Sequence, residues 1–218
     1  MISQLIRRCI GSLLILCAIA GVAFGGAKSV IRLQPLGRKL TPRQIAAVKR
    51  AIIAFYAVDV EVAPRLPLPK LAYYPPRKRY RAEKILDWLA PTVPKRLRLV
   101  LAITATDIST SKPPHKDWGV LGLATLDGRV SVISLFRCRR RARSVRHALV
   151  RLMKVAVHEV GHNLGLDHCP HRGCLMEDGH GSVLTTDRER DLCPSCRRAL
   201  ERRGYRLPAP PKEIWSER

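Results

Sequence analysis

Apolar and polar residues alternate with two different periods over the first half of the chain. Runs at 29–36, 59–63 and 97–104 have the β-branched or continuously apolar character of strands. Residues 42–57 instead repeat apolar positions at helical spacing, with Thr41 placed to cap that helix and Pro42 at its first position. This half of the chain therefore predicts three strands with a helix between the first two.

The middle of the chain carries a proline-rich interruption and a hairpin signal. Residues 64–76 contain too many prolines for a regular element, so we expect a surface loop there. Helical spacing returns over 80–89. Residues 119–126 and 130–136 have strand character, and Asp127-Gly128 between them is typical of a tight turn. We therefore expect these two strands to pair antiparallel.

A long amphipathic helix is predicted from a Ser144 cap to about residue 164. Its apolar residues recur every three or four positions, at Val145, Leu149, Leu152, Ala156, Val160 and Leu164. A final helical segment is expected to begin near Thr186, where Thr186 and Glu189 have the spacing of a capping box. It should break at Pro194, resume, and stop at Gly204.

The first 27 residues have the pattern of a targeting segment. Arg7 and Arg8 precede an apolar run at 10–24, and small residues follow it. About fifteen apolar residues are fewer than the ~20 that a spanning helix needs. We expect residues 1–27 to be a signal peptide or an N-terminal membrane anchor. The mature protein would be periplasmic or secreted, or held at the membrane.

The length and charge of the chain limit what the rest can be. Its 218 residues suffice for one core, which we place at 28–206 with a tail at 207–218. The formal net charge is +23, which favours a polyanion or an anionic membrane surface as a partner. The basic residues are dispersed and no nucleic-acid motif accompanies them, so we expect no specific nucleic-acid partner, and we expect a monomer.

Three histidines have the spacing of metal ligands. His158 and His162 are four residues apart on the predicted helix, so both imidazoles lie on one face and can bind one ion. Gly165 can end the helix with a positive φ and return the chain so that His168 becomes a third ligand. The run from His158 to His168 matches the extended zincin signature, which predicts a catalytic zinc.

Glu159 lies beside the first ligand, within reach of a water on the metal. We expect this carboxylate to act as general base for a zinc-bound water that attacks a peptide bond. The predicted activity is that of a zinc-dependent metallopeptidase acting on peptide or protein substrates. The alternative is a weak or inactive zinc-stabilised module that binds polyanions through its basic surface.

Four more cysteines follow the third histidine, at positions 169, 174, 193 and 196. Four thiolates at this spacing suit a closed structural zinc, which would be the second zinc of the chain. Two disulfides, or a redox pair at Cys193 and Cys196, are the alternatives. Cys138 would have a lowered pKa if it were exposed among the arginines of residues 137–146, which we interpret as a solvated loop or an anionic docking patch.

The zincin run, the cysteines Cys169, Cys174, Cys193 and Cys196, and Met176 together resemble the archaemetzincin family of metzincin-type peptidases. The resemblance implies a twisted mixed β-sheet with helices, a small C-terminal lobe, and two zinc ions. It implies that Met176 lies beneath the metal site, and that a peptide binds along an edge strand, for which residues 119–126 are our candidate. His115, His147, His171 and His180 lie outside the ligand spacing and are expected at the surface, with His180 a candidate to line the cleft.

Overall fold

The computed structural model describes residues 30–209 and 213–215, so the predicted targeting segment at 1–27 lies outside the described residues. Within the described residues, no helix has the length and apolar character needed to cross a bilayer.

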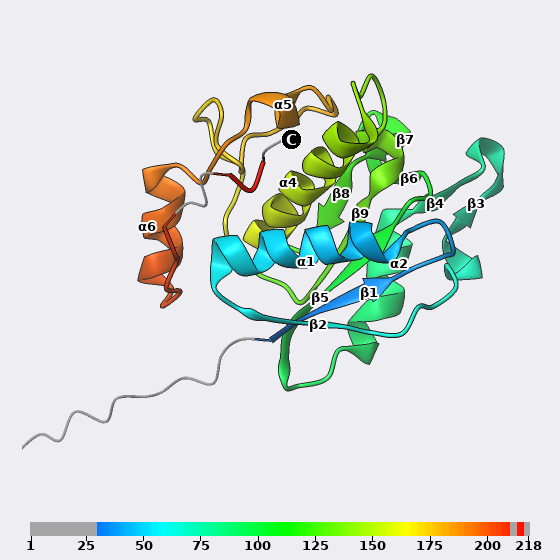
Figure 1. The fold of residues 1–218 in the computed structure, drawn as a ribbon. Coiled ribbons are helices and arrows are strands. Elements are labelled where there is room, and N and C mark those ends of the chain that lie inside the picture. The colour runs from blue at the N-terminus through cyan, green and yellow to red at the C-terminus, as the bar shows by residue number, and fades with distance from the viewer. Residues whose placement is uncertain (1–29, 210–212, 216–218) are drawn as a thin grey trace, which may run out of the picture.

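The main sheet has five strands in the order β2-β1-β5-β9-β8 (Figure 1). They are β1 (Val30–Pro35), β2 (Asp59–Val62), β5 (Leu97–Thr104), β8 (Gly122–Ala124) and β9 (Val130–Ser134). The first four strands of the order are parallel neighbours, and only the edge strand β8 pairs antiparallel, with β9. The predicted hairpin is thereby confirmed. Strands β5 and β9 are buried on both faces, as expected of strands inside a largely parallel sheet.

Helices cover both faces of this sheet. Helices α1 (Pro42–Tyr56) and α4 (Val145–Asn163) pack on one face, in front of the sheet in Figure 1. Helix α2 (Ala82–Leu89) covers the other face. Alternate residues of β5 point to opposite faces of the sheet. Leu99 and Leu101 lie in the core under α1 and α4, and Val100 lies in the core under α2. Thr41 caps α1 as predicted, and in the structure it forms a capping box with Gln44.

A second sheet of four short strands, in the order β3-β4-β6-β7, was not predicted. Its strands are β3 (Tyr73–Tyr74), β4 (Arg79–Arg81), β6 (Ile108–Lys112) and β7 (His115–Val120). The helix predicted over 80–89 therefore begins later, at Ala82, because Tyr80 and Arg81 pair with β6. The predicted loop at 64–76 is also more ordered than expected, with short 3-10 turns at Lys70–Ala72 and Pro75–Arg77 around β3. A third short 3-10 turn, Ala90–Thr92, follows α2.

The predicted strand at 119–126 is divided between the two sheets. Gly119 and Val120 pair with β6, whereas the residues of β8 pair with β9. Leu121 marks the crossing, and its carbonyl accepts a hydrogen bond from Ser134 N at 2.8 Å. The candidate substrate strand is therefore β8 alone.

Helix α4 has the predicted length, and Ser144 caps it through the His147 N–H. It is buried nearly all round, because α1, the sheet and the segment after it enclose it. Among the predicted core positions, Leu149 is partly buried and Val145 is 81 % exposed at the first turn.

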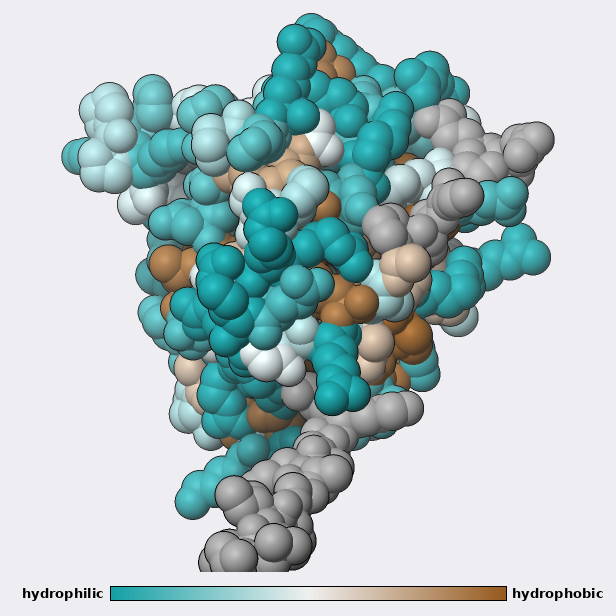
Figure 2. All heavy atoms as spheres, turned by 90° about the vertical axis from the view of Figure 1, so that its left-hand side faces the viewer, coloured by the Kyte–Doolittle hydropathy of each residue, from teal (hydrophilic) through white to brown (hydrophobic). Residues whose placement is uncertain are grey.

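The C-terminal part contains two helices, the short α5 (Thr185–Arg188) and α6 (Pro194–Arg202). A further short helix, α3 (Leu135–Cys138), lies before α4 in the chain. The capping box predicted at Thr186 is wrong: Leu184 is the N-cap of α5, without a side-chain cap, and Glu189 follows its last turn. Pro194 is the first residue of α6, which ends before Gly204. The face that carries α6 is mostly hydrophilic (Figure 2).

Candidate functional site

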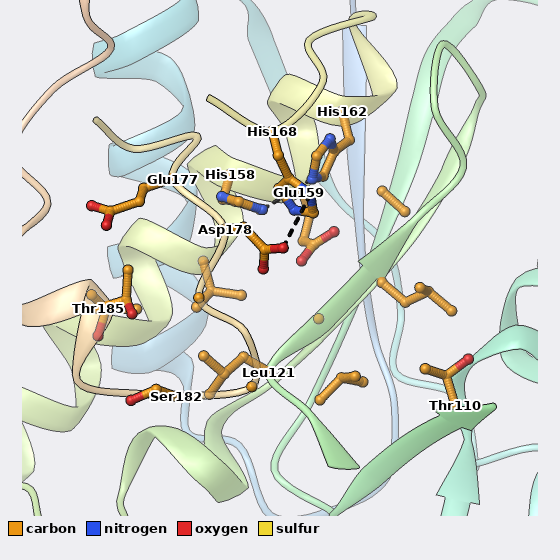
Figure 3. A pocket seen from close by; sticks show the side chains of 18 of the residues that line it. Thr110, Leu121, His158, Glu159, His162, His168, Glu177, Asp178, Ser182 and Thr185 are labelled. Atoms are coloured by element: carbon orange, nitrogen blue, oxygen red, sulfur yellow. Dashed lines mark hydrogen bonds and ion pairs between the residues drawn. The ribbon is translucent and has the colours of Figure 1, made fainter. Parts of the chain in front are cut away.

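Three histidines converge at the mouth of a cavity of about 360 Å³ (Figure 3). One ring nitrogen from each of His158, His162 and His168 lies within 4.8 Å of the others. The Nε2 atoms of His158 and His162 are 3.0 Å apart. The structure therefore brings together all three histidines that the sequence predicted as ligands.

Backbone carbonyls orient the two helical imidazoles. His158 Nδ1 lies 2.7 Å from Leu175 O, and His162 Nδ1 lies 2.7 Å from Leu166 O. A carbonyl only accepts, so Nδ1 carries the proton in both rings and Nε2 offers its lone pair to the cavity. Burial and the neighbouring His162 lower the pKa of His158 to about 3, and burial lowers that of His162. Both rings are therefore neutral, as ligands must be.

A sharp turn delivers the third histidine. Gly165 has φ +90°, and Leu166 N donates to Gly161 O at 2.9 Å. This reversal places His168 opposite the helix, where Asp178 Oδ2 is 3.9 Å from its Nδ1. Gly165 is thus a position where an L side chain would be strained, as the sequence indicated.

Met176 packs against α4 at Gly161, between the two helical histidines in the sequence. It is fully buried, and a Cβ at Gly161 would stand 2.5 Å from its Sδ and 3.2 Å from Tyr56 Oη. The Tyr56 hydroxyl donates to Val157 O at 2.6 Å. Gly161 therefore allows Met176 and Tyr56 to pack against the helix where it carries the histidines.

Glu159 points into the same cavity, beside the histidines in Figure 3. Burial raises the pKa of its carboxyl to about 8, and a cation held by the adjacent imidazoles would oppose that shift. A Cβ on Gly122 of β8 would overlap the Glu159 carboxyl group. The absence of a side chain at Gly122 leaves this carboxyl open to the cavity.

One wall of the cavity is the free edge of the main sheet. Leu121, Gly122, Leu123 and Ala124 line it, and β8 has no partner on its outer side among the described residues. The opposite wall comes from the segment after Met176, including Gly179, Ser182 and Thr185. An exposed strand edge across from a wall is an arrangement that can bind an extended peptide.

The four predicted cysteine ligands form a second cluster, away from this cavity. Their sulfurs lie within 4.8 Å of one another, with Cys169 and Cys193 at 3.6 Å and Cys174 and Cys196 at 3.7 Å. All four are free cysteines in this structure, so neither of the alternatives, two disulfides or a bonded redox pair, is present in it. A tetrahedron of ~2.3 Å zinc–sulfur bonds has edges of about 3.8 Å, so the observed distances fit one zinc.

Backbone N–H groups donate to two of these four sulfurs. Cys174 Sγ accepts from Met176 N at 3.4 Å and from Cys193 N at 3.3 Å, and Cys169 Sγ accepts from His171 N at 3.4 Å. Hydrogen bonds from Cys196 and from these amides lower the pKa of Cys174 to about 5. A donor set of this kind suits a divalent cation.

A buried ion-pair cluster was missed at the sequence level. Arg151 is 1 % exposed and binds Asp187 through two hydrogen bonds of 2.7 Å, and His147 Nε2 lies 2.8 Å from the same carboxylate. His147 was expected at the surface, so that prediction is wrong. No spacing rule joins residues of α4 to a carboxylate 36 residues later.

The structure also bears on three smaller expectations, and it confirms that His180 lies at the surface. Cys138 is buried, and burial raises the pKa of its thiol to about 12, which excludes a reactive thiolate. Arg137 is not part of a solvated loop, because it binds both carboxylate oxygens of Asp107. His180 is exposed beside Asp178 and does not line the cavity, although its neighbours Gly179 and Gly181 do.

Comparisons with known proteins cover this whole region. The model of peptidase family M54 matches residues 69–202, which include every histidine and cysteine of the two clusters. Archaemetzincin from Natronomonas pharaonis is 34% identical over 166 residues, covering 71% of this chain and 92% of that protein. The archaemetzincin from Methanocaldococcus jannaschii is 32% identical over 148 residues, covering 66% of this chain and 78% of that protein.

The chain is also similar to solved structures of archaemetzincins. The crystal structure of archaemetzincin from Methanopyrus kandleri aligns with a TM-score of 0.69 at 28% identity, covering 83% of this chain and 98% of that one. Archaemetzincin from Archaeoglobus fulgidus, crystallised with malonate, aligns with a TM-score of 0.66 at 28% identity, covering 78% and 98%.

Proposed function

This chain belongs to peptidase family M54, the archaemetzincins, and is therefore a zinc metallopeptidase; from that premise we propose that Glu159 is its general base and that β8 binds the substrate. The observation that carries the proposal is the convergence of three imidazoles beside a carboxyl group in one cavity.

The histidine cluster fits a catalytic zinc. His158, His162 and His168 would hold it through ring nitrogens that point to one centre from two sides. Three protein ligands leave one position open toward the cavity. Zinc bound there would supply Lewis acidity, polarising a carbonyl and lowering the pKa of water.

Glu159 performs the proton transfers in this proposal. Its carboxylate accepts a proton from the attacking water and delivers that proton to the leaving amine nitrogen. Its place at the floor of the cavity, opposite the bare backbone of Gly122, puts it beside a peptide that lies along β8. Main-chain hydrogen bonds to β8 would hold that peptide in extended form.

The cysteine cluster would hold a second, structural zinc. The cluster joins the segment after His168 to the start of α6, since Cys169 and Cys174 belong to the former and Cys193 and Cys196 to the latter. Four protein ligands leave no position for water, so this zinc would contribute to folding. It would also fix the segment that carries His168.

Glu159→Gln tests the assignment of the base. The variant keeps the shape of the side chain but cannot accept the proton, so we expect kcat to fall by about 10²–10⁴-fold while two zinc ions per chain remain. Peptide cleavage is measured by mass spectrometry and zinc by elemental analysis. Glu201→Gln, an exposed position on α6, is the matched control.

Two outcomes would overturn the proposal. Unchanged cleavage by Glu159→Gln would show that another group is the base. No cleavage by the wild-type protein, zinc-loaded and tested on mixed peptide libraries, would favour the alternative of a zinc-stabilised binding module.

A further inference from the structure

The cavity is acidic although the protein is strongly basic. The chain has 40 lysine and arginine residues and only 17 aspartate and glutamate residues. Five of those acids nevertheless line this one cavity, together with a single cation, Lys112. They are Glu159, Asp167, Glu177, Asp178 and Glu189. The lining therefore has the charge sign opposite to that of the whole molecule.

Most of these acids already have partners. Glu177 binds Arg188 and accepts from Gly173 N at 2.7 Å, and Asp178 lies 3.2 Å from His180. Asp167 accepts from His168 N at 2.7 Å. Glu159 is assigned to the reaction. These four carboxylates are accounted for without any ligand.

Glu189 differs from the others. The residue is 3 % exposed, yet its carboxyl group has no hydrogen bond or ion pair among the described residues. It follows the last turn of α5, where its N–H donates to Thr185 O at 3.3 Å, and Thr185 and Thr186 also line the cavity. Lys154 exerts some attraction on Glu189, but its ammonium donates to Thr186 O at 2.7 Å and lies over the Trp215 ring. Burial dominates and raises the pKa of Glu189 to about 8.

The direction of the substrate decides which residue meets Glu189. Strand β8 begins at Gly122, on the side of Leu121, Ser182 and Thr185, as Figure 3 shows. Past the other end of β8, Asp127 N donates to His162 O at 2.8 Å. Antiparallel pairing is slightly more stable than parallel pairing, and it makes a bound peptide run toward Leu121. The residue after the scissile bond then lies on the side of Glu189.

We propose that Glu189 makes this enzyme selective for lysine or arginine at the residue that follows the scissile bond. The proposal rests on the proposed function, because it assumes a peptide paired with β8. A buried carboxyl without a partner is costly, and a cationic side chain that enters the cavity would ionise it and supply the missing hydrogen bonds. A neutral side chain of the same length would leave it unsatisfied.

Binding to an inactivated protein tests the selectivity without catalysis. The zinc-loaded Glu159→Gln protein is titrated calorimetrically with two peptides that differ only in lysine or norleucine, which lacks the amine, after the scissile bond. We expect the lysine peptide to bind about tenfold more tightly or better. Adding Glu189→Gln should reduce that ratio to about twofold or less.

Glu177→Gln is the matched control, because Glu177 also lines the cavity but is held by Arg188. Its lysine-to-norleucine ratio should stay that of the parent. A ratio near one in the parent protein, or a ratio that Glu189→Gln leaves unchanged, overturns the proposal. A ratio reduced equally by Glu177→Gln also overturns it, because the general field of the cavity would then be sufficient.

Cleavage assays separate this proposal from the proposed function. If wild-type protein cleaves both peptides equally well, the selectivity fails and the peptidase stands. If neither peptide is cleaved yet the binding ratio follows Glu189, the selectivity stands and the assignment of catalysis fails. A preference for lysine or arginine at the residue before the scissile bond would overturn the antiparallel placement of the peptide. It would also overturn the assignment of Glu189 to the residue after that bond.

Discussion

The histidine cluster and the cysteine cluster both bring metal-binding atoms close together, but they differ in their access to solvent. Each gathers its ligand atoms within 4.8 Å. The histidines open on a cavity, and the side chain of His168 is 47% exposed. Three of the four cysteines are buried, and backbone amides donate to the sulfurs of Cys169 and Cys174. A metal in the first cluster can exchange ligands with the solvent, whereas a metal in the second would be enclosed.

The two clusters are also connected through the chain. Cys169 directly follows His168, and Cys169 N donates to Met176 O at 2.7 Å, next to the packing beneath the site. Damage to the closed cluster should therefore reach the open one, whereas damage to the open cluster should stay local. The following predictions test that asymmetry, from the largest expected effect to the smallest.

Cys174→Ser should damage both clusters. Loss of one thiolate weakens the enclosed zinc, so we expect unfolding to require on the order of 3 to 5 kcal/mol less free energy and peptidase activity to be lost. Chemical denaturation and zinc stoichiometry measure both effects. Cys138→Ser is the control, since Cys138 is a buried thiol outside the cluster. Similar stability losses in the two variants would contradict a metal at the cysteines.

Brief treatment with a chelator should affect the histidine cluster and leave the cysteine cluster intact. The open site is expected to lose zinc first, so activity should disappear while about one zinc per chain and the circular dichroism spectrum remain. Re-addition of zinc should restore activity. Simultaneous loss of both metals, with unfolding, would show that the enclosed cluster offers no protection.

Asp187→Asn should loosen the connection between α4 and α5. Arg151 would keep a buried charge without a carboxylate to balance it, since the new amide and the two backbone carbonyls are neutral acceptors, at a cost of about 3 kcal/mol at neutral pH. Arg151 and His147 lower the pKa of Asp187 to about 2 from 3.8. Its stabilising contribution is therefore complete above about pH 4 and is lost as the pH falls through 2. The free energy of unfolding of variant and wild type is measured with urea from pH 7 to 2. The difference between the two proteins should become smaller only at the acid end of this range.

Gly161→Ala should have the smallest effect on stability, but it should also disturb the histidine cluster. In an exposed helix this change stabilises by up to ~1 kcal/mol, whereas here the new methyl group meets Met176 and Tyr56. We expect a net destabilisation of about 1 to 2 kcal/mol and weaker zinc affinity at the open site. Thermal unfolding and zinc titration check this. A stabilised variant with unchanged zinc affinity would show that Met176 yields without disturbing the histidines.

The sequence determined the elements and the ligands of this protein, because both depend on local spacing. The helix at 144–164, the strands around it and the hairpin at 127–128 follow from apolar periodicity, caps and turn residues. The three histidines are recognisable because two share a helix face and a glycine turns the chain back to the third. The four cysteines were recognised by their spacing, although spacing alone left disulfides open.

Tertiary structure decided what depends on contacts between distant residues. Residues 119–126 had strand character throughout, but only pairing with β6 and β9 divided them between two sheets. Thr186 and Glu189 had the spacing of a helix cap, yet burial at the end of α5 turned Glu189 into a lining residue of the cavity. His147 was expected at the surface, but in the fold it is buried with Arg151 against Asp187, whose carboxylate lies 2.8 Å from the His147 ring. Periodicity describes which face a residue occupies, and only the packed fold determines what lies opposite that face.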